Sequence, residues 1–226
     1  MRDRTKIYYG LIAGLVVMTG VFFIVRRNRM SSFKKRLIDN TIREWKLWGK
    51  PTRDGSGGFD SGSTECTPIY EERVGEYWKK GTGKNLDGCD RSTPWSSAFI
   101  SFVMKKSGAG DDFVYSSAHN KYIRPFIQNR KQNNKSPFKA YKLSEKSVQV
   151  GDLICYSRQS NVNYDTTSSY KSHCDIVVDV NKFKKTAEVI GGNVSDGVTK
   201  RIVNLNSQGN LTDTSQDWFT IIKNKK

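Results

Sequence analysis

The chain has 226 residues, which is enough for one globular domain with attachments. Lys and Arg outnumber Asp and Glu by 38 to 22, so the formal net charge is +16 and an anionic partner is expected: phospholipid, a cell-wall polymer or nucleic acid. The basic residues are spread along the whole chain, with neither a clustered recognition helix nor a paired aromatic RNA-binding motif, and we expect no specific nucleic-acid binding.

The first predicted element is an apolar segment, IYYGLIAGLVVMTGVFFIV (residues 7–25), which contains no charged residue. It is long enough for a helix to cross a hydrocarbon core of about 30 Å. Because it ends in FFIV and arginines rather than at a small-residue cleavage site, the sequence favours a retained transmembrane helix over a cleaved signal peptide. Residues 1–30 are therefore expected to form an anchor in a lipid bilayer, either a cell membrane or the internal membrane of a virion.

The charges beside this segment predict its orientation. Arg2, Arg4 and Lys6 precede it, whereas a larger set of basic residues follows it between positions 26 and 36. By the positive-inside rule, the C-terminal part of this single-pass membrane protein is expected on the interior side. A cell-wall enzyme would need the opposite orientation.

An amphipathic helix is expected next, because apolar residues fall on one side of a helical projection. These residues are Phe33, Leu37, Ile38, Ile42, Trp45 and Trp48. Two interpretations stay open: the helix lies on the membrane, or it packs on the domain. A Gly-, Ser- and Asp-rich run follows, so residues 31–64 are expected to be a juxtamembrane helix and linker, and residues 65–226 the globular domain.

The stretch TPWSSAFISFVMKKSG predicts a buried helix with Thr93 as its N-cap, Pro94 at the first helical position and Gly108 at its end. Ser96 then lies in the first turn. Free N–H groups and the helix dipole favour developing negative charge there, which suits an activated nucleophile. A serine in a first helical turn is also ordinary, so position alone does not make Ser96 catalytic.

The rest of the chain predicts an α+β fold, because helices come first and strands follow. A second helix is expected over residues 116–128 and contains His119. The stretch VQVGDLICYS predicts a turn at Gly151 and Asp152 that leads into an apolar strand, and the further predicted strands are HCDIVVDV, KTAEVIGGNV, VTKRIVNL and DWFTIIKN. In HCDIVVDV, His173 and Asp175 share one face and Cys174 points to the other.

Five motifs in order resemble a bacterial family known as domain of unknown function 2272: PWSSAFISFVMKKSG, YSSAHNKYI, GDLICYSR, SHCDIVVDV and VIGGNVSDGVTKR. That family is similar in turn to the papain-like cell-wall peptidases and amidases of the NlpC and CHAP type. The resemblance covers roughly residues 70–204. It implies a papain-like domain with N-terminal helices and a small antiparallel sheet, here preceded by one transmembrane helix.

The resemblance also implies a catalytic site. In those hydrolases a cysteine opens the helix, a histidine starts a following strand, and a polar residue on the next strand orients the histidine. The matching positions here are Ser96, His173 and Asn193. The serine departs from the family pattern.

The substitution matters because a thiol beside histidine can become a thiolate, for which an orienting Asn suffices. A serine hydroxyl loses its proton during attack and leaves an imidazolium that needs a carboxylate partner. Asp196 or Asp175 could supply that charge, although Asp175 would have to bend back along its own strand. His119 either lines the groove near Ser96 or caps local backbone.

The remaining features bear on gating, metals and redox state. The polar loop over residues 157–172 is longer than most connections and is either a gate or an ordinary surface loop. The 4 cysteines include no CxxC pair and the chain has 2 histidines, so we expect neither a metal nor a cofactor. Cys66 and Cys89 either pair in an oxidising compartment or remain free thiols.

These observations predict a membrane-anchored peptidoglycan hydrolase-like protein, a peptidase or amidase whose partner is peptidoglycan or another anionic polymer. The alternative is a catalytically silent hydrolase fold in a membrane-tethered structural protein. Such a protein could be a minor capsid protein that links an internal viral membrane to its shell and contacts virion or envelope proteins.

Overall fold

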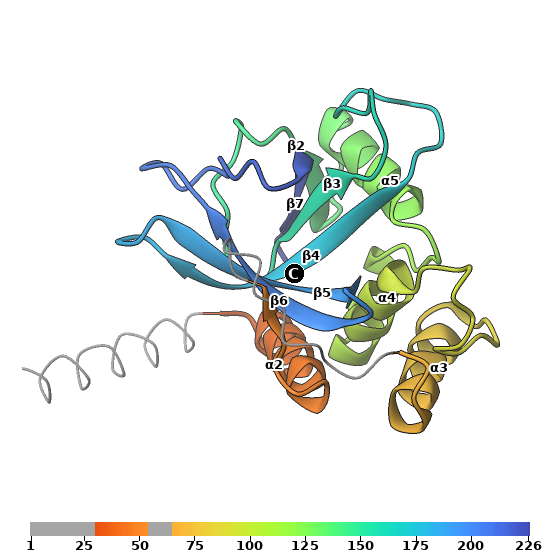
Figure 1. The fold of residues 1–226 in the computed structure, drawn as a ribbon. Coiled ribbons are helices and arrows are strands. Elements are labelled where there is room, and N and C mark those ends of the chain that lie inside the picture. Colours follow the sequence, from red (N-terminus) through yellow and green to blue (C-terminus); the bar gives the residue numbers. More distant parts are fainter. Residues whose placement is uncertain (1–29, 54–64) are drawn as a thin grey trace, which may run out of the picture.

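The computed structural model describes residues 30–53 and 65–226. Its elements are α2 (Ser32–Leu47), β1 (Thr52–Arg53), α3 (Pro68–Thr82), α4 (Ser96–Ser107), the 3-10 helix η1 (Gly110–Asp112), α5 (Asn120–Lys131), β2 (Phe138–Tyr141), β3 (Leu153–Ser157), β4 (Ser172–Asn181), β5 (Thr186–Val194), β6 (Gly197–Asn204) and β7 (Asp217–Asn224). The predicted α+β class is confirmed (Figure 1).

The sheet is larger than expected. It has seven strands in the order β1-β6-β5-β4-β3-β7-β2. β1 pairs in parallel with β6, and the other pairs are antiparallel. The prediction of a small antiparallel sheet is therefore wrong: the sheet is mixed, and its two outer strands have only 2 and 4 residues, too few to show an alternating pattern in the sequence.

The expected transmembrane helix is not supported. Within residues 30–53 and 65–226, no helix combines the length and the apolar character needed to cross a membrane. The segment on which the expectation rested, residues 7–25, lies outside the described residues. The predictions of an anchored fold and of a single-pass membrane protein in a cell or virion membrane are corrected accordingly.

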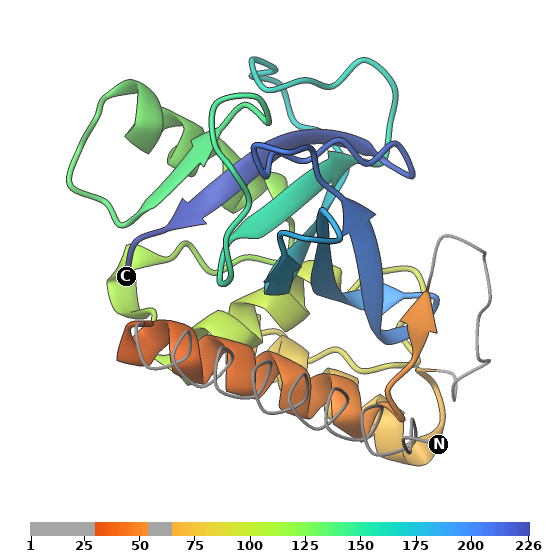
Figure 2. The ribbon, with the colours of Figure 1, turned by 90° about the vertical axis from the view of Figure 1, so that its left-hand side faces the viewer.

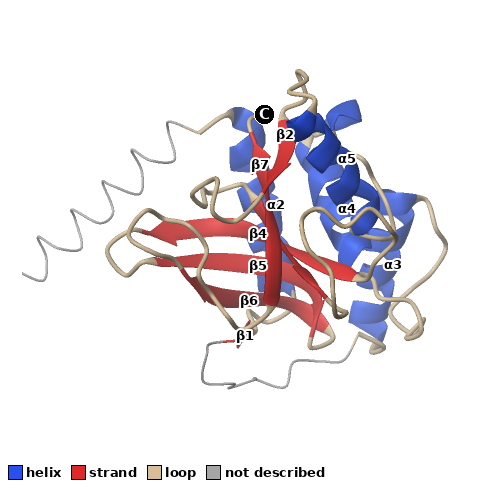
Figure 3. Cartoon of the chain, turned by 90° about the horizontal axis from the view of Figure 1, so that it is seen from above, coloured by secondary structure: helices blue, strands red, loops and turns tan. Residues whose placement is uncertain are grey.

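Helix α4 is the central helix of the fold. Its residues from Ser96 to Met104 are all buried, because it packs against α2, α3, β4 and β5 (Figure 3). Gly192 in β5 permits the close approach of strand and helix, since an added Cβ would lie 2.5 Å from Cβ of Phe99. The apolar stripe in the sequence marks one buried side of the helix, but α4 is buried on its serine-bearing side as well, which the stripe does not indicate.

Both predicted helices of the domain start later than expected. α4 begins at Ser96 with Trp95 as N-cap and no side-chain capping bond, so the prediction of Thr93 as N-cap is wrong. The backbone N–H of Thr93 instead donates to the carbonyl of Asp90 over 2.9 Å, in a turn before the helix. α5 begins at Asn120, with His119 as its N-cap.

Helix α2 packs on the domain, which resolves the two interpretations left open above. Its buried residues are Phe33, Leu37, Ile38, Thr41 and Glu44. The helix runs along the base of the molecule beneath the strands (Figure 2). The Ser31 hydroxyl donates to the carbonyl of Lys226 over 2.6 Å, so the start of α2 adjoins the end of the strand β7 segment.

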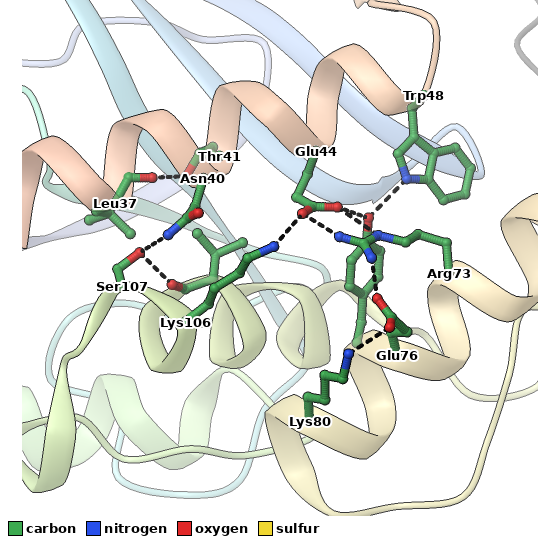
Figure 4. Close-up of polar contacts among 12 residues, drawn as sticks. Leu37, Asn40, Thr41, Glu44, Trp48, Arg73, Glu76, Lys80, Lys106 and Ser107 are labelled. Carbon is green, nitrogen blue, oxygen red and sulfur yellow. Dashed lines mark hydrogen bonds and ion pairs between the residues drawn. The ribbon is translucent and has the colours of Figure 1, made fainter.

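A buried polar network holds the C-terminal half of α2 (Figure 4). Nε of Arg73 donates to the Glu44 carboxylate over 2.8 Å, and the Tyr77 hydroxyl donates to it over 3.0 Å. Lys106 forms an ion pair with the same carboxylate at 3.3 Å, and the indole N–H of Trp48 donates to the Tyr77 hydroxyl over 3.0 Å. The network therefore links α2 to α3 and α4 in one place.

All four cysteines form disulfides: Cys66 with Cys89, and Cys155 with Cys174. The pairing considered for Cys66 and Cys89 is present, and the alternative of free thiols is not. Cys155 and Cys174 lie directly opposite each other on β3 and β4. Disulfides of this kind persist in oxidising compartments.

Candidate active site

Ser96 is the first residue of α4, and its side chain meets a histidine. Its Oγ lies 2.7 Å from Nε2 of His119, and the two residues are 3% and 4% exposed. His119 approaches from the start of α5, so the contact joins the N-terminal ends of two helices. The free N–H groups of a first helical turn and the helix dipole favour negative charge at this place.

The second ring nitrogen of His119, Nδ1, is hydrogen-bonded to the Tyr122 hydroxyl. Burial holds the pKa of His119 well below its usual value, so the ring is neutral at neutral pH. Burial also raises the pKa of Tyr122 well above its usual value, and the phenol keeps its proton. In the His119 tautomer protonated on Nδ1, the Ser96 hydroxyl donates to a bare Nε2, which is the arrangement of a nucleophile and its base.

A second polar set lies on β4 and β6. Nε2 of His173 is 3.0 Å from Oδ1 of Asp175, and the other carboxylate oxygen of Asp175 pairs with the Arg201 guanidinium. Burial would raise the pKa of Asp175, but the charge of Arg201 and the hydrogen bonds from His173 and Arg201 outweigh it and hold the pKa at about 2. The carboxylate is therefore ionised and can only accept, so Nε2 of His173 carries the proton.

This assignment leaves the other nitrogen of His173 without a partner. Burial lowers the pKa of His173, although Asp175 raises it in part, so the ring is neutral. Neutral His173 protonated on Nε2 has a bare Nδ1, and in the described part of the chain this buried atom has no hydrogen-bond partner. His173 thus presents a free acceptor.

Aromatic rings frame this second set. The Tyr156 ring lies 5.0 Å from the His173 ring, and the Arg201 guanidinium lies over the rings of Tyr156 and Trp218 at 5.2 and 5.6 Å. Stacking on two rings fixes a guanidinium in place. Arg201 therefore holds the Asp175 carboxylate against His173.

The two sets meet, since the ring centroids of His119 and His173 are 5.2 Å apart. The whole cluster is closed: His173 is 1% exposed and Asp175 is 0% exposed. An open depression of about 330 Å³ lies nearby on α5, but its lining residues include neither histidine nor Ser96. The polar cluster is therefore covered in this structure.

Of the three residues expected to be catalytic, the structure brings Ser96 close to a histidine, but to His119 rather than to His173. Asn193, on β5, is half-buried and forms no hydrogen bond with His173. Nε2 of His173 contacts Asp175, and within the described residues its Nδ1 has no hydrogen-bond partner. The residue that contacts the His173 ring, and so could orient it, is Asp175. Asp175 bends back along its own strand to reach His173.

Gly191 makes that contact possible. A Cβ added to Gly191 would lie 1.9 Å from Oδ1 of Asp175 and 2.8 Å from Nε2 of His173. Any side chain on this residue of β5 would occupy the space that the His173–Asp175 contact fills. The requirement explains the first glycine of the sequence motif GGNV.

Sequence reasoning missed Arg201 although a signal exists. In β6, Arg201 and Val203 are buried, whereas Ile202 between them is 43% exposed. A charged residue in phase with the buried side of a strand is a candidate for a buried ion pair. The same strand therefore buries a charged residue, Arg201, and exposes an apolar one, Ile202.

The polar loop predicted over residues 157–172, for which a gate and an ordinary surface loop both stay open, lies between β3 and β4 and is hydrogen-bonded to α5 and to β2. Nδ2 of Asn120 donates to the Ser169 hydroxyl over 3.0 Å, and the Tyr164 hydroxyl donates to the carbonyl of Ala140 over 2.8 Å. The Asn120 tie is next to His119 in the chain. The loop is thus attached beside the site.

One group of possible metal ligands lies elsewhere. Ligand atoms of Glu71, Asp87 and Cys89 lie within 4.8 Å of one another. The sulfur of Cys89 is in the disulfide with Cys66, which leaves two carboxylates. Two carboxylates alone make an acidic surface cluster, so we assign no metal there.

The sequence comparisons give the family. Residues 58–223 match the family model described as "Uncharacterized protein conserved in bacteria (DUF2272)". The chain belongs to DUF2272. No curated protein and no solved structure matches it. The similarity of this DUF2272 domain to NlpC and CHAP peptidases therefore stays a prediction, and the polar cluster stands on its own geometry.

Proposed function

We propose that the DUF2272 domain is a serine hydrolase of amide bonds, with Ser96 as the nucleophile and His119 as its base. The observation that carries the proposal is the 2.7 Å contact between Ser96 Oγ and His119 Nε2 at the first residue of α4. A neutral buried imidazole in this contact is ready to accept the hydroxyl proton.

The proposed reaction proceeds by acyl transfer. Ser96 Oγ attacks the carbonyl carbon of the substrate while its proton passes to Nε2 of His119. The oxyanion forms near the first N–H groups of α4, which favour negative charge. His119 then returns the proton to the leaving amine, and water hydrolyses the acyl-serine.

A serine mechanism needs a negative charge near the imidazolium, and Asp175 supplies it in this proposal. Its pKa of about 2 keeps it ionised at every physiological pH. The Asp175 carboxylate accepts a hydrogen bond from His173, and the ring centroid of His173 is 5.2 Å from that of His119. The bare Nδ1 of His173 is also a second acceptor, suited to take a proton from the attacking water.

Peptide amides, including those of peptidoglycan, are the proposed substrate class. The support is the resemblance to cell-wall peptidases and amidases and the net charge of +16, which suits an anionic polymer. Neither support is specific for one bond.

The test uses the full chain against peptidoglycan and a set of peptide amides. We expect Ser96→Ala to abolish turnover and His119→Gln to lower kcat by about 10²–10⁴-fold. A fluorophosphonate should label Ser96 of the native chain, as located by mass spectrometry, since it reacts with activated serines whatever the natural substrate.

Ser101→Ala is the matched control. The Ser101 hydroxyl, which is also buried on α4, donates to the carbonyl of Ser116 over 3.0 Å. This variant should keep its activity and its labelling. Unchanged turnover in Ser96→Ala, or labelling confined to other serines, would contradict the proposal.

The second candidate is a catalytically silent hydrolase fold with a structural role. The observation that favours it is burial: Ser96, His119 and His173 are 3%, 4% and 1% exposed. In that case the native chain and all variants are inert, and Ser96→Cys stays inert as well. Activity gained by Ser96→Cys in an otherwise inert chain would instead mean an intact site whose nucleophile was given up.

A further inference from the structure

The hairpin between β4 and β5 ends in an exposed aromatic ring among lysines. Its four-residue tip, residues 182–185, lies between the paired residues Asn181 and Thr186. The Phe183 side chain is 98% exposed, the highest exposure of any large hydrophobic residue that the structure describes. Lys182, Lys184 and Lys185 are exposed on either side of it.

The tip is a fixed turn. The backbone N–H of Lys184 donates to Oδ1 of Asn181 over 3.0 Å, and the N–H of Leu205 donates to the carbonyl of Lys185 over 2.8 Å. Lys185 has φ 53°, the left-handed conformation that reverses the chain. The hairpin projects from one end of the sheet, away from α3 and α5 (Figures 1 and 3).

The side chains of the three tip lysines are exposed. Within the described residues, no ion pair includes Lys182, Lys184 or Lys185. A single exposed apolar side chain is ordinary on a protein surface. The hairpin tip combines an almost fully exposed ring on a fixed turn with three exposed lysines, and within the described residues these side chains form no ion pair and pack into no core.

We propose that this hairpin tip binds an anionic phospholipid surface, with Phe183 in the interfacial region and the three lysines on the headgroup phosphates. Aromatic rings favour the boundary between headgroups and acyl chains, and lysines beside them are attracted to anionic lipid. The contact is a surface contact, and it is independent of the proposed hydrolysis.

A bilayer fits this tip better than nucleic acid does. Proteins that bind single strands track the backbone in a basic groove and stack successive bases on several aromatic residues. The tip is convex and offers one ring. A soft, flat, anionic surface needs no groove, because the protrusion itself enters the interface.

The test places an environment-sensitive dye on the full chain at Phe183→Cys. The four native cysteines are in disulfides, so the new thiol is the one that reacts. The dye reports the tip whatever other part of the chain touches a vesicle. The probes are vesicles of phosphatidylcholine alone and of phosphatidylcholine with phosphatidylglycerol at about 30%, the anionic fraction needed for a negative surface potential.

The expected result is a blue shift of the dye emission with the anionic vesicles only. Lys182→Gln, Lys184→Gln and Lys185→Gln, introduced together, should weaken the titration by about fivefold per lysine, or about a hundredfold in all. The matched control removes the same charge elsewhere: Lys121→Gln, Lys135→Gln and Lys171→Gln together should leave the titration unchanged.

Ile69→Cys is the positional control, because Ile69 is 79% exposed on α3, at the other end of the molecule (Figure 1). A dye there should not shift. The proposal is overturned by an equal shift at both positions, by an equal shift on neutral vesicles, or by no shift at Phe183→Cys. A shift produced by a single-stranded oligonucleotide and not by vesicles would also overturn it and assign the tip to nucleic acid.

Discussion

Gly191 shows how one residue of the sheet shapes the polar cluster. Its missing side chain leaves the volume in which Asp175 reaches back to His173, with only 1.9 Å between an added Cβ and the carboxylate oxygen. Neither partner can retreat, because both are buried and Arg201 holds the far side of the carboxylate. The backbone of β5 and the ion pair therefore depend on each other.

Gly191→Ala should lower the free energy of unfolding by about 1–3 kcal/mol, the usual cost of forcing extra volume into a packed interior. Urea denaturation at pH 7.5 measures it. Gly75→Ala is the control, because an added Cβ within helix α3 would meet atoms at 3.7 and 3.8 Å, which is ordinary contact. That variant should be stabilised by about 0.5–1 kcal/mol, since Ala is the better helix former. Equal effects of the two substitutions would argue against the packing account.

At the residue scale, the sequence predicted where the polar residues of the site lie on their elements better than which of them contact one another. Ser96 was placed in a first helical turn, and His173 and Asp175 were placed on one face of a strand, as the structure has them. The contact of Ser96 with His119 depends on how the connection between α4 and α5 folds, and no periodicity encodes that distance. Whether these residues act in catalysis stays a prediction.

Among the elements, α2 is held in part by Glu44, a carboxylate that is 0% exposed. Its partners come from the two helices that it crosses, with Arg73 and Tyr77 on α3 and Lys106 on α4. A buried carboxylate is tolerated while its charged partners surround it. Removing the carboxylate leaves those partly buried charges without this counter-charge, which lowers the free energy of unfolding.

Glu44→Ala should therefore lower the free energy of unfolding by about 2–3 kcal/mol. This is less than the 3–5 kcal/mol typical of a fully buried pair, because the Arg73 and Lys106 side chains are 21% and 31% exposed and regain some hydration. Hydrogen exchange should speed up along α2. The control is Glu72→Ala on the exposed side of α3, which should stay within about 0.5 kcal/mol of the parent. Unchanged exchange in α2 would mean that its apolar face suffices for docking.

The elements that could be predicted are those with a strong period. α2, α4 and the strands β3 to β7 all appear within a few residues of the segments expected for them. α3 was missed because it follows a Gly- and Ser-rich run and contains Gly75 and Gly81, which lower the helical signal. Gly81 has a packing role instead, since an added Cβ would lie 2.6 Å from the carbonyl oxygen of Ala98 in α4.

At the scale of the whole molecule, both histidines of the chain are buried, so the free energy of unfolding should depend on pH where histidines titrate. Burial lowers the pKa of His119 and His173 in the folded state. The unfolded chain takes up protons as the pH falls below about 6.5, whereas the folded chain does not. Their contribution is complete above that pH and is lost below it.

The free energy of unfolding should fall by up to about 1.4 kcal/mol per pH unit for each histidine below pH 6.5. Asp175 adds a further loss between about pH 4 and its folded pKa of about 2, because its carboxylate must then be protonated. Urea denaturation at pH 7.5, 6.0 and 5.0 measures the slope, and His119→Gln should remove about half of it. A flat profile between pH 7.5 and 5.0 would show that the histidines protonate in the folded state.

The whole fold was predictable as a class and not as an arrangement. Helices before strands gave α+β, but the parallel addition of β1 to β6 joins residues far apart in the chain and follows from no local pattern. The expected anchor did not gain support either. Apolar composition over residues 7–25 was the ground for that expectation, and no described helix has the required length and composition.

The closed state of the polar cluster has a consequence for how hydrolysis would look in solution. In the proposed hydrolysis, substrate would bind only to molecules in which the cover over Ser96 and His119 has moved, so the apparent affinity would be the intrinsic affinity multiplied by the open fraction. With one molecule in about a hundred open, binding is about a hundredfold weaker than the site itself allows. Variants that loosen this cover would then bind substrate more tightly while unfolding more easily, so resistance to urea and apparent affinity would move in opposite directions.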